Sequence, residues 1–217
     1  MNAAKDCTLQ EKLLRCAMAL ILAAGALLAS VAASPAYAAP STVDVSIGGK
    51  IPYGGFATTW MSADGNIAYC AEPSSPTPAP GSYSTSPVPS GDVTAAIWYS
   101  FGSPGFDASM FPGSWYDGGG WDDAKYAAAS HVLIAYAYSG SESAATHGTS
   151  AEFASWAKSE LIGGTFAKMK AGAGKVSAGF EAFCVRTGGG SQTPVSFSWS
   201  TGGVKVAKTD SEAGAAP

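Results

Sequence analysis

Two short segments of this 217-residue chain hold the side chains best suited to chemistry. A cysteine, Cys70, follows Tyr69 in the first, and a glutamine, Gln192, stands in the second, 122 residues further on. A thiol that attacks the side-chain carbonyl of glutamine expels ammonia and leaves a thioester. Such a bond survives only where both groups are held together and water is kept from the acyl carbon. The pair therefore predicts an internal Cys70–Gln192 thioester if the fold places the two side chains on neighbouring strands.

The first 38 residues have the pattern of a signal peptide. Three basic residues precede the apolar run 17–33, and the small residues Ala36 and Ala38 fit a signal-peptidase site. A permanent membrane anchor is the alternative, but Gly25 and Ser30 interrupt the apolar run. We expect residues 1–38 to be removed, so that the mature protein begins at Ala39, is secreted or displayed at the cell surface, and has no further membrane contact.

The charge of the remaining chain argues against nucleic acid as a partner. Residues 39–217 carry 9 basic and 14 acidic side chains, a net charge near −5. Binding nucleic acid needs clustered lysines and arginines, which are missing here. The length suits one domain, which we place at 39–201, followed by a linker or the start of a further domain at 202–217.

Cys70 has a second possible use, in a disulfide. Once residues 1–38 are removed, Cys70 and Cys184 are the two cysteines left. Exported proteins meet oxidising conditions, in which two cysteines readily pair. A Cys70–Cys184 disulfide would exclude the thioester and would favour a non-covalent carbohydrate- or protein-binding module. Cys184 can equally be an inert buried thiol.

Strand patterns stand at both ends of the domain and helix patterns in its middle. Residues 42–47 alternate polar and apolar side chains, and Gly48-Gly49 is expected to form the following turn. Further strands are predicted at 57–61, 66–71, 182–186, 193–200 and 204–207. The fold class we expect is α+β, with a β-sandwich or barrel-like scaffold and an inserted α-helical subdomain.

Three helices are expected in the insertion. They cover 93–101 with Asp92 as N-cap, 122–138, and 150–162 with a capping box of Thr149 and Glu152. The proline-rich segment 73–91 is expected to be a surface loop. This loop and the segment 115–121 are our candidates for target contact. Aromatic residues are expected to wall the thioester site: Tyr69, Trp98, Tyr99, Phe101, Trp115, Tyr116 and Trp121.

His131, on the predicted helix 122–138, is a candidate for proton transfer beside Cys70. The alternative is a partly buried structural histidine. A hydrolase that uses Cys70 and His131 is disfavoured, because a strand offers the thiolate no helix N-terminus. A glycosidase could draw on Asp117, Asp122 and Asp123, although helix capping explains the last two. Neither a metal nor a cofactor is expected, because no paired metal-ligand spacing occurs.

Three segments, in this order, resemble the signature blocks of a known family. They are Tyr69-Cys70-Ala71, the segment 93–99 (Val-Thr-Ala-Ala-Ile-Trp-Tyr) and the segment 191–195 (Ser-Gln-Thr-Pro-Val). Similar blocks mark the thioester domains of surface adhesins and pilus tips of Gram-positive bacteria, the TQXA-type domains. The middle block departs from the pattern, because Val93-Thr94 stand where that family has Thr-Gln.

The resemblance implies that Cys70 and Gln192 form the thioester and that the middle block packs beside them. It implies covalent capture of a host-surface or extracellular-matrix protein, through an isopeptide-like amide to a lysine amine, in a single turnover, so the domain would not be an enzyme. Residues 204–214 resemble the first strand of the Cna-B or SpaA-like stalk domains of one subgroup. We therefore expect downstream stalk domains and a cell-wall location if the full gene adds a sorting signal.

Overall fold

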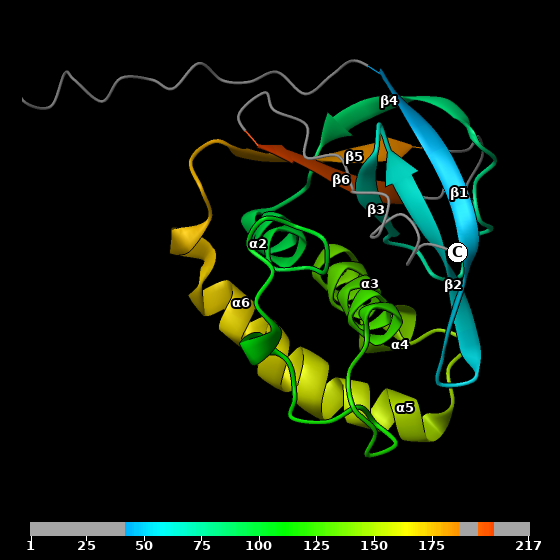
Figure 1. Ribbon diagram of the computed structural model, residues 1–217, viewed down its shortest axis with the longest axis vertical. Coiled ribbons are helices and arrows are strands. Elements are labelled where there is room, and N and C mark those ends of the chain that lie inside the picture. Colours follow the sequence, from blue (N-terminus) through cyan, green and yellow to red (C-terminus); the bar gives the residue numbers. More distant parts are fainter. Residues whose placement is uncertain (1–41, 187–194, 202–217) are drawn as a thin grey trace, which may run out of the picture. The chain divides into compact units, whose positions relative to one another are not determined.

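Six antiparallel strands close into a barrel, and the helices gather on one side of it (Figure 1). The computed structural model describes residues 42–186 and 195–201. Around the barrel the strand order is β1-β2-β3-β6-β5-β4, closed by pairing of β4 with β1. The strands are β1 (Thr42–Tyr53), β2 (Phe56–Ala63), β3 (Asn66–Cys70), β4 (Gly81–Pro87), β5 (Phe180–Arg186) and β6 (Val195–Thr201). The expected α+β class with a barrel-like scaffold and a helical insertion is confirmed.

The two faces of the strands bury two different cores. Side chains that point into the barrel form a small apolar cluster of Val43, Val45, Met61, Ala63, Ala68, Cys70, Phe183 and Val185. Side chains on the other face join a larger cluster with the helices, to which Tyr69 and Cys184 belong. Neighbouring residues of a strand point to opposite faces, so Tyr69 and Cys70 enter different cores.

The predicted turn at Gly48-Gly49 is wrong. β1 continues through both glycines to Tyr53, and its pairing with β2 shifts between Ile47 and Lys50, where one extra residue makes a β-bulge. The turn comes at Gly54-Gly55, which both have the left-handed conformation, with φ of 54° and 81°. A side chain at residue 54 would also overlap the ring of Phe153, so two separate constraints favour glycine there.

The helices lie between β4 and β5 in the sequence. They are α2 (Gly91–Trp98), η1 (Ala108–Met110), α3 (Asp123–Ser139), α4 (Glu142–Ala145), α5 (Ala151–Trp156), the π-helix η2 (Ala157–Phe166), α6 (Ala167–Ala171) and η3 (Ala173–Lys175). The prediction of a helix at 122–138 is confirmed, with Asp122 as the N-cap of α3 and Gly140 as its left-handed C-cap. Nine consecutive α3 residues, 127–135, are buried, so α3 is enclosed on all sides.

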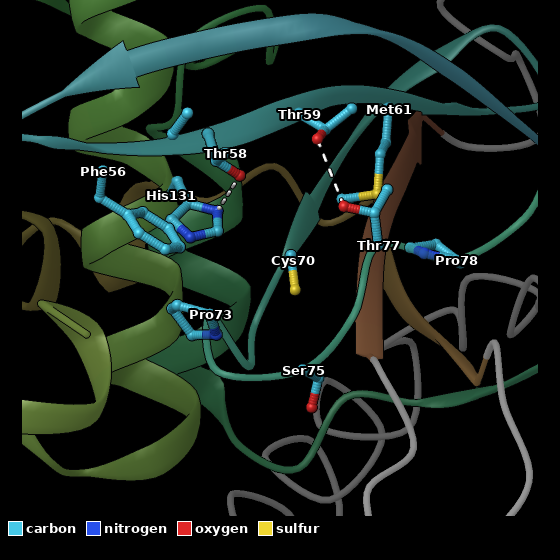
Figure 2. Close-up of a pocket in the computed structure, with 11 residues that line it drawn as sticks. Phe56, Thr58, Thr59, Met61, Cys70, Pro73, Ser75, Thr77, Pro78 and His131 are labelled. Carbon is cyan, nitrogen blue, oxygen red and sulfur yellow. Dashed lines mark hydrogen bonds between the residues drawn. The ribbon is translucent and has the colours of Figure 1, made fainter. Parts of the chain in front are cut away.

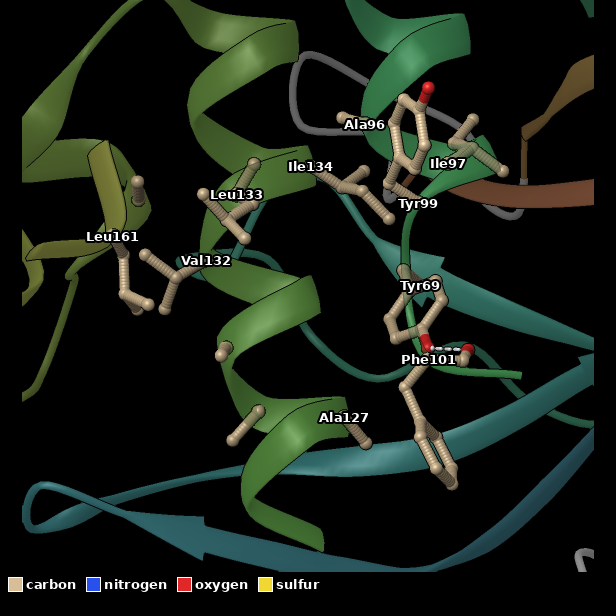
Figure 3. Close-up of a cluster of buried hydrophobic side chains, with 14 of the residues drawn as sticks. Tyr69, Ala96, Ile97, Tyr99, Phe101, Ala127, Val132, Leu133, Ile134 and Leu161 are labelled. Atoms are coloured by element: carbon tan, nitrogen blue, oxygen red, sulfur yellow. Dashed lines mark hydrogen bonds between the residues drawn. The ribbon is translucent and has the colours of Figure 1, made fainter. Parts of the chain in front are cut away.

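Figure 3 shows how α3 fills the larger core. Val132, Leu133 and Ile134 lie between Leu161 of η2 and the Tyr69 and α2 side chains. The Tyr69 hydroxyl donates a 2.5 Å hydrogen bond to the backbone carbonyl of Phe101. This packing fixes the α3 helix against the strand that carries Cys70.

Several local predictions need correction. Ser90 caps α2 in place of Asp92, whose carboxylate pairs with Lys170 at 2.8 Å, and α2 ends at Trp98. Ser150, one residue after the expected Thr149, caps α5. The predicted helix 150–162 continues to Ala171, because the chain passes from α5 into the π-helix without a break. The expected loop 73–91 contains β4, whose pairing with β1 and β5 closes the barrel.

Candidate functional site

A small cavity opens beside the end of β3 and is lined by both Cys70 and His131 (Figure 2). Its volume is about 60 Å³, enough for a few water molecules. Its wall comes from β2, β3, α3 and the segment that follows β3: Phe56, Ala57, Thr58, Thr59, Met61, Cys70, Pro73, Ser75, Thr77, Pro78 and His131. Two cavity threonines, Thr59 and Thr77, lie 3.4 Å apart through their hydroxyls. The site is thus a narrow space edged with hydroxyl groups.

Cys70 is the last residue of β3, and its side chain is 9% exposed. Its thiol donates a hydrogen bond to the carbonyl oxygen of Glu72 at 3.3 Å. Burial raises the pKa of the Cys70 thiol to about 11; a backbone hydrogen bond at Glu72 opposes the rise and the Glu72 charge adds to it. Cys70 is therefore a neutral thiol at physiological pH, the reverse of the activated thiolate that a cysteine hydrolase uses.

His131 reaches the cavity from the buried middle of α3 and is 2% exposed. Its Nδ1 lies 3.2 Å from the Oγ1 of Thr58, and no described residue is a hydrogen-bond partner of its Nε2. When Nδ1 donates to Thr58, Nε2 keeps a free lone pair. The Nε2 lone pair of His131 is then buried and without a partner among the described residues.

A further polar atom near this site is without a partner among the described residues. The hydroxyl of Tyr53 is buried and has no hydrogen-bond partner there, and the Tyr53 ring lies 6.0 Å from the His131 ring, centroid to centroid. Burial raises the pKa of Tyr53, and the charge of a Cys70 thiolate would raise it further. Two unsatisfied polar groups in one region are unusual in a core that serves only for packing.

Acid should destabilise the fold through His131. Burial lowers the pKa of His131 from 6.5 to about 4. Between pH 6.5 and pH 4, His131 is protonated in the unfolded chain but still neutral in the folded protein. The free energy of unfolding is therefore highest above pH 6.5 and falls as the pH drops towards 4, by about 3 kcal/mol in all. Urea unfolding at pH 7 and pH 4.5 measures this. We expect His131→Gln to flatten the dependence and exposed His147→Gln, the control, to leave it unchanged. If the unfolding free energy of His131→Gln falls with pH as steeply as that of wild type, the assignment of the pH dependence to His131 is wrong.

Gln192, the predicted partner of Cys70, lies outside the described residues. The strand that follows it, β6, begins three residues later at Val195. In the register of the barrel, Cys70 pairs with Ser196 and Tyr69 with Phe197. The start of β6 is therefore hydrogen-bonded beside the end of β3, which carries the cysteine.

The alternative Cys70–Cys184 disulfide is wrong. Both cysteines are free and buried. Cys70 pairs with position 196 of β6 and Cys184 with position 197, so the two cysteines flank β6 and point to opposite faces. Two strands apart, their Cα atoms are roughly 10 Å from each other, whereas a disulfide needs less than about 7 Å. Cys184 is instead a buried thiol of the larger core.

The aromatic residues that were expected to surround the thioester site lie elsewhere in the fold. Of the seven aromatic residues predicted to line the site, none lines the cavity; Phe56 does. Tyr69 points away from Cys70, and Trp115 is 4% exposed, its ring packed 5.0 Å from that of Trp156. Trp115 is therefore core and not contact surface.

The acidic residues near Trp115 have local structural uses. Asp122 caps α3 by accepting a hydrogen bond from the Lys125 backbone NH at 2.9 Å. Asp117 accepts a 2.8 Å bond from the Gly119 backbone NH. Neither lines the cavity beside Cys70. Within residues 42–186 and 195–201, no group of histidine, cysteine or acidic side chains is arranged to hold a metal ion.

Several cavity residues went unnoticed in the sequence. Thr58 and Thr59 are strand threonines with no motif around them, and only the folded chain brings Thr58 to His131, 73 residues away. Glu72, whose backbone carbonyl accepts the hydrogen bond from the Cys70 thiol, stands two residues after Cys70, and that closeness was the one available signal.

The part of the chain that contains Cys70 and His131 matches a known protein family. The family model of the thioester domain matches residues 42–164, more than half of the chain. This chain belongs to the thioester domain family. The match covers the first four strands and the helices up to η2, and so includes Cys70 and His131 but stops before β5 and β6. Searches of the curated proteins and of the solved structures found no match for this thioester domain.

The middle block of the thioester domain forms α2. Its buried side chains Val93, Ala96 and Ile97 belong to the larger core, and the helix packs against β5 and β6. Thr94, in the place of the glutamine of the TQXA pattern, donates to the carbonyl of Ser90. No helix within the described ranges is long and apolar enough to span a membrane.

Proposed function

We propose that this thioester domain is the binding end of a bacterial surface adhesin, which captures a host protein through a Cys70–Gln192 thioester. The observation that carries the proposal is the position of Cys70 in a family thioester domain: a buried neutral thiol that faces a small cavity together with a histidine. The partner would be a host-surface or matrix protein that offers a lysine amine.

Formation of the bond needs proximity more than activation. The Cys70 sulfur attacks the side-chain carbonyl carbon of Gln192, the sulfur–carbon bond forms, and the carbon–nitrogen bond breaks. The thiol proton leaves with the amide nitrogen as ammonia, so atoms balance without a cofactor. The register of β6 beside β3 supports this step, because it brings the chain that leads to Gln192 to the end of β3.

Capture is the reverse exchange with a different amine. The amine nitrogen of the target attacks the acyl carbon, a carbon–nitrogen bond forms, and the carbon–sulfur bond breaks. The proton that the nitrogen loses must reach the sulfur, because burial holds the pKa of the Cys70 thiol near 11 and disfavours a free thiolate. We infer that Nε2 of His131, which carries a lone pair when Nδ1 donates to Thr58, moves this proton; the lining of one cavity by both His131 and Cys70 supports this role.

The products explain why a single turnover is expected. Residue 192 ends as an amide to the target and Cys70 as a neutral thiol. An amide is far less reactive than a thioester, and nothing in the proposed steps regenerates the acyl–sulfur bond. The domain would thus act once, as an adhesin at the cell surface, rather than as a catalyst.

Intact mass tests the proposal directly. Protein that lacks residues 1–38 is purified without reductant and weighed before and after treatment with methylamine. We expect a mass short by one ammonia, which rises by one methylamine on treatment while a thiol appears at Cys70. A mass equal to that of the unmodified sequence, with no response to methylamine, would refute the thioester.

A further inference from the structure

A second, larger cavity adjoins the one beside Cys70. Its volume is about 210 Å³, and its wall is the segment after β3 together with the end of α3 and α4: Ala71, Glu72, Pro73, Ser74, Ser75, Tyr138, Ser139 and Ala144. Pro73 and Ser75 line both cavities. The short segment after Cys70 is therefore the shared wall between the two spaces.

The second cavity carries negative charge. Glu72 is half-buried in its wall, and the Oγ of Ser75 donates to Glu72 Oε2 at 3.3 Å. The ion pairs found in the described part of the chain join Lys125, Lys158 and Lys170 to other carboxylates, and none involves Glu72. Tyr138 and Ser139 belong to the last turn of α3, where the helix dipole adds partial negative charge.

Glu72 is also close to the reacting sulfur. Its backbone carbonyl accepts the hydrogen bond from the Cys70 thiol, and its negative charge contributes to the raised pKa of that thiol. By contrast, none of the described residues that line the Cys70 cavity itself is acidic. Among the described residues that line the two cavities, the one carboxylate is that of Glu72, in the wall of the adjoining space.

We propose that the second cavity is the entry site for a cationic amine, in which Glu72 binds the target ammonium and directs it over Ser75 to the acyl group on Cys70. The inference rests on the proposed thioester and adds the route by which the amine, a primary alkylammonium such as a lysine side chain, reaches the acyl group, and the carboxylate that binds it on the way. The ammonium loses one proton to solvent from the Glu72 site and attacks as the neutral amine. Its second proton leaves during attack and reaches the Cys70 sulfur, so one proton is released per amide formed.

The test compares a charged with an uncharged small nucleophile. Methylamine is almost entirely a cation at neutral pH, whereas hydroxylamine is uncharged, and both open thioesters. Release of the Cys70 thiol is followed with a chromogenic disulfide reagent in wild type, Glu72→Gln and the matched control Glu160→Gln, whose exposed carboxylate lines neither cavity. Intact mass first establishes the loss of ammonia in each protein.

We expect Glu72→Gln to slow the reaction with methylamine about tenfold, the lower end of the rate increase that a charged cleft gives to a counter-ion, and to leave hydroxylamine within about twofold of wild type. Added salt should slow methylamine in wild type and not in Glu72→Gln. Equal slowing of both nucleophiles, or of neither, would overturn the entry site. If Glu72→Gln does not assemble the thioester, the salt dependence of the wild-type rate provides the test. A wild-type methylamine rate that does not change with added salt would also overturn the entry site. Absence of the ammonia loss in wild type would instead refute the thioester itself.

Discussion

Replacing Cys70 by alanine is expected to abolish covalent capture completely, because alanine offers no sulfur to hold the acyl group. The fold should remain, since the change removes one sulfur from the small barrel core and costs about 1 kcal/mol of unfolding free energy. Adducts with host surface proteins, resolved on a denaturing gel after boiling, measure capture. Boiling-resistant adducts formed by Cys70→Ala would contradict the assignment of Cys70.

The barrel provides a matched control in Cys184→Ala. Cys184 is also a buried thiol next to β6, yet it points into the larger core, away from the cavity. We expect this variant to keep the ammonia loss and the adducts of the wild type. Loss of capture in Cys184→Ala alone would mean that the wrong cysteine has been assigned.

Replacing His131 by glutamine is expected to slow capture about 100-fold, the usual loss when a positioned acid–base group is removed. The side chain of glutamine fills most of the space in the core but cannot pass a proton from the amine to the sulfur. The rate of thiol release with methylamine measures the effect, and intact mass shows whether the thioester is still present. Thioester that forms in His131→Gln and reacts as fast as wild type would remove His131 from the mechanism.

A second variant separates proton transfer from packing. Thr58→Val keeps the shape of the Thr58 side chain and removes the hydroxyl that lies 3.2 Å from His131 Nδ1. If His131 acts through Nε2, loss of this partner should slow thiol release by a smaller factor than His131→Gln does. Wild-type rates in Thr58→Val would show that the hydrogen bond does not hold the imidazole for the reaction.

The elements that depend on residues close in sequence were predicted from local sequence patterns. The buried helix α3 follows from its apolar alanine-rich stretch between Asp122 and Gly140, and β3 with Cys70 at its end was placed within one residue. The bulge at Gly48-Gly49 was missed because two glycines signal a turn locally, whereas pairing with β2 holds them in the strand. β4 was missed because prolines surround it and its partners, β1 and β5, are distant in sequence.

The cavity could not be predicted from sequence for the same reason. Its wall draws on β2, the end of β3, the following segment and α3, which meet only when the barrel closes and α3 packs against it. Aromatic residues were expected there because they exclude water well, but four of the seven, Phe101, Trp115, Tyr116 and Trp121, pack instead against Phe153 or Tyr126. The neighbourhood of Glu72 was equally hidden, because nothing in the sequence places the end of α3 beside it.

The place of β6 has a mechanical consequence for the proposed capture. The amide to the target would sit on residue 192, and β6 ends at Thr201, from which the chain continues. A pulling force between the target and the chain beyond β6 would pass along these ten residues of backbone. Neither the remaining strands nor the helices would carry this force. The carbon–sulfur bond would not carry it either, because capture has already broken it. Tension strong enough to unravel the barrel would then leave the tether intact, so adhesion strength would be set by covalent bonds and not by folding stability.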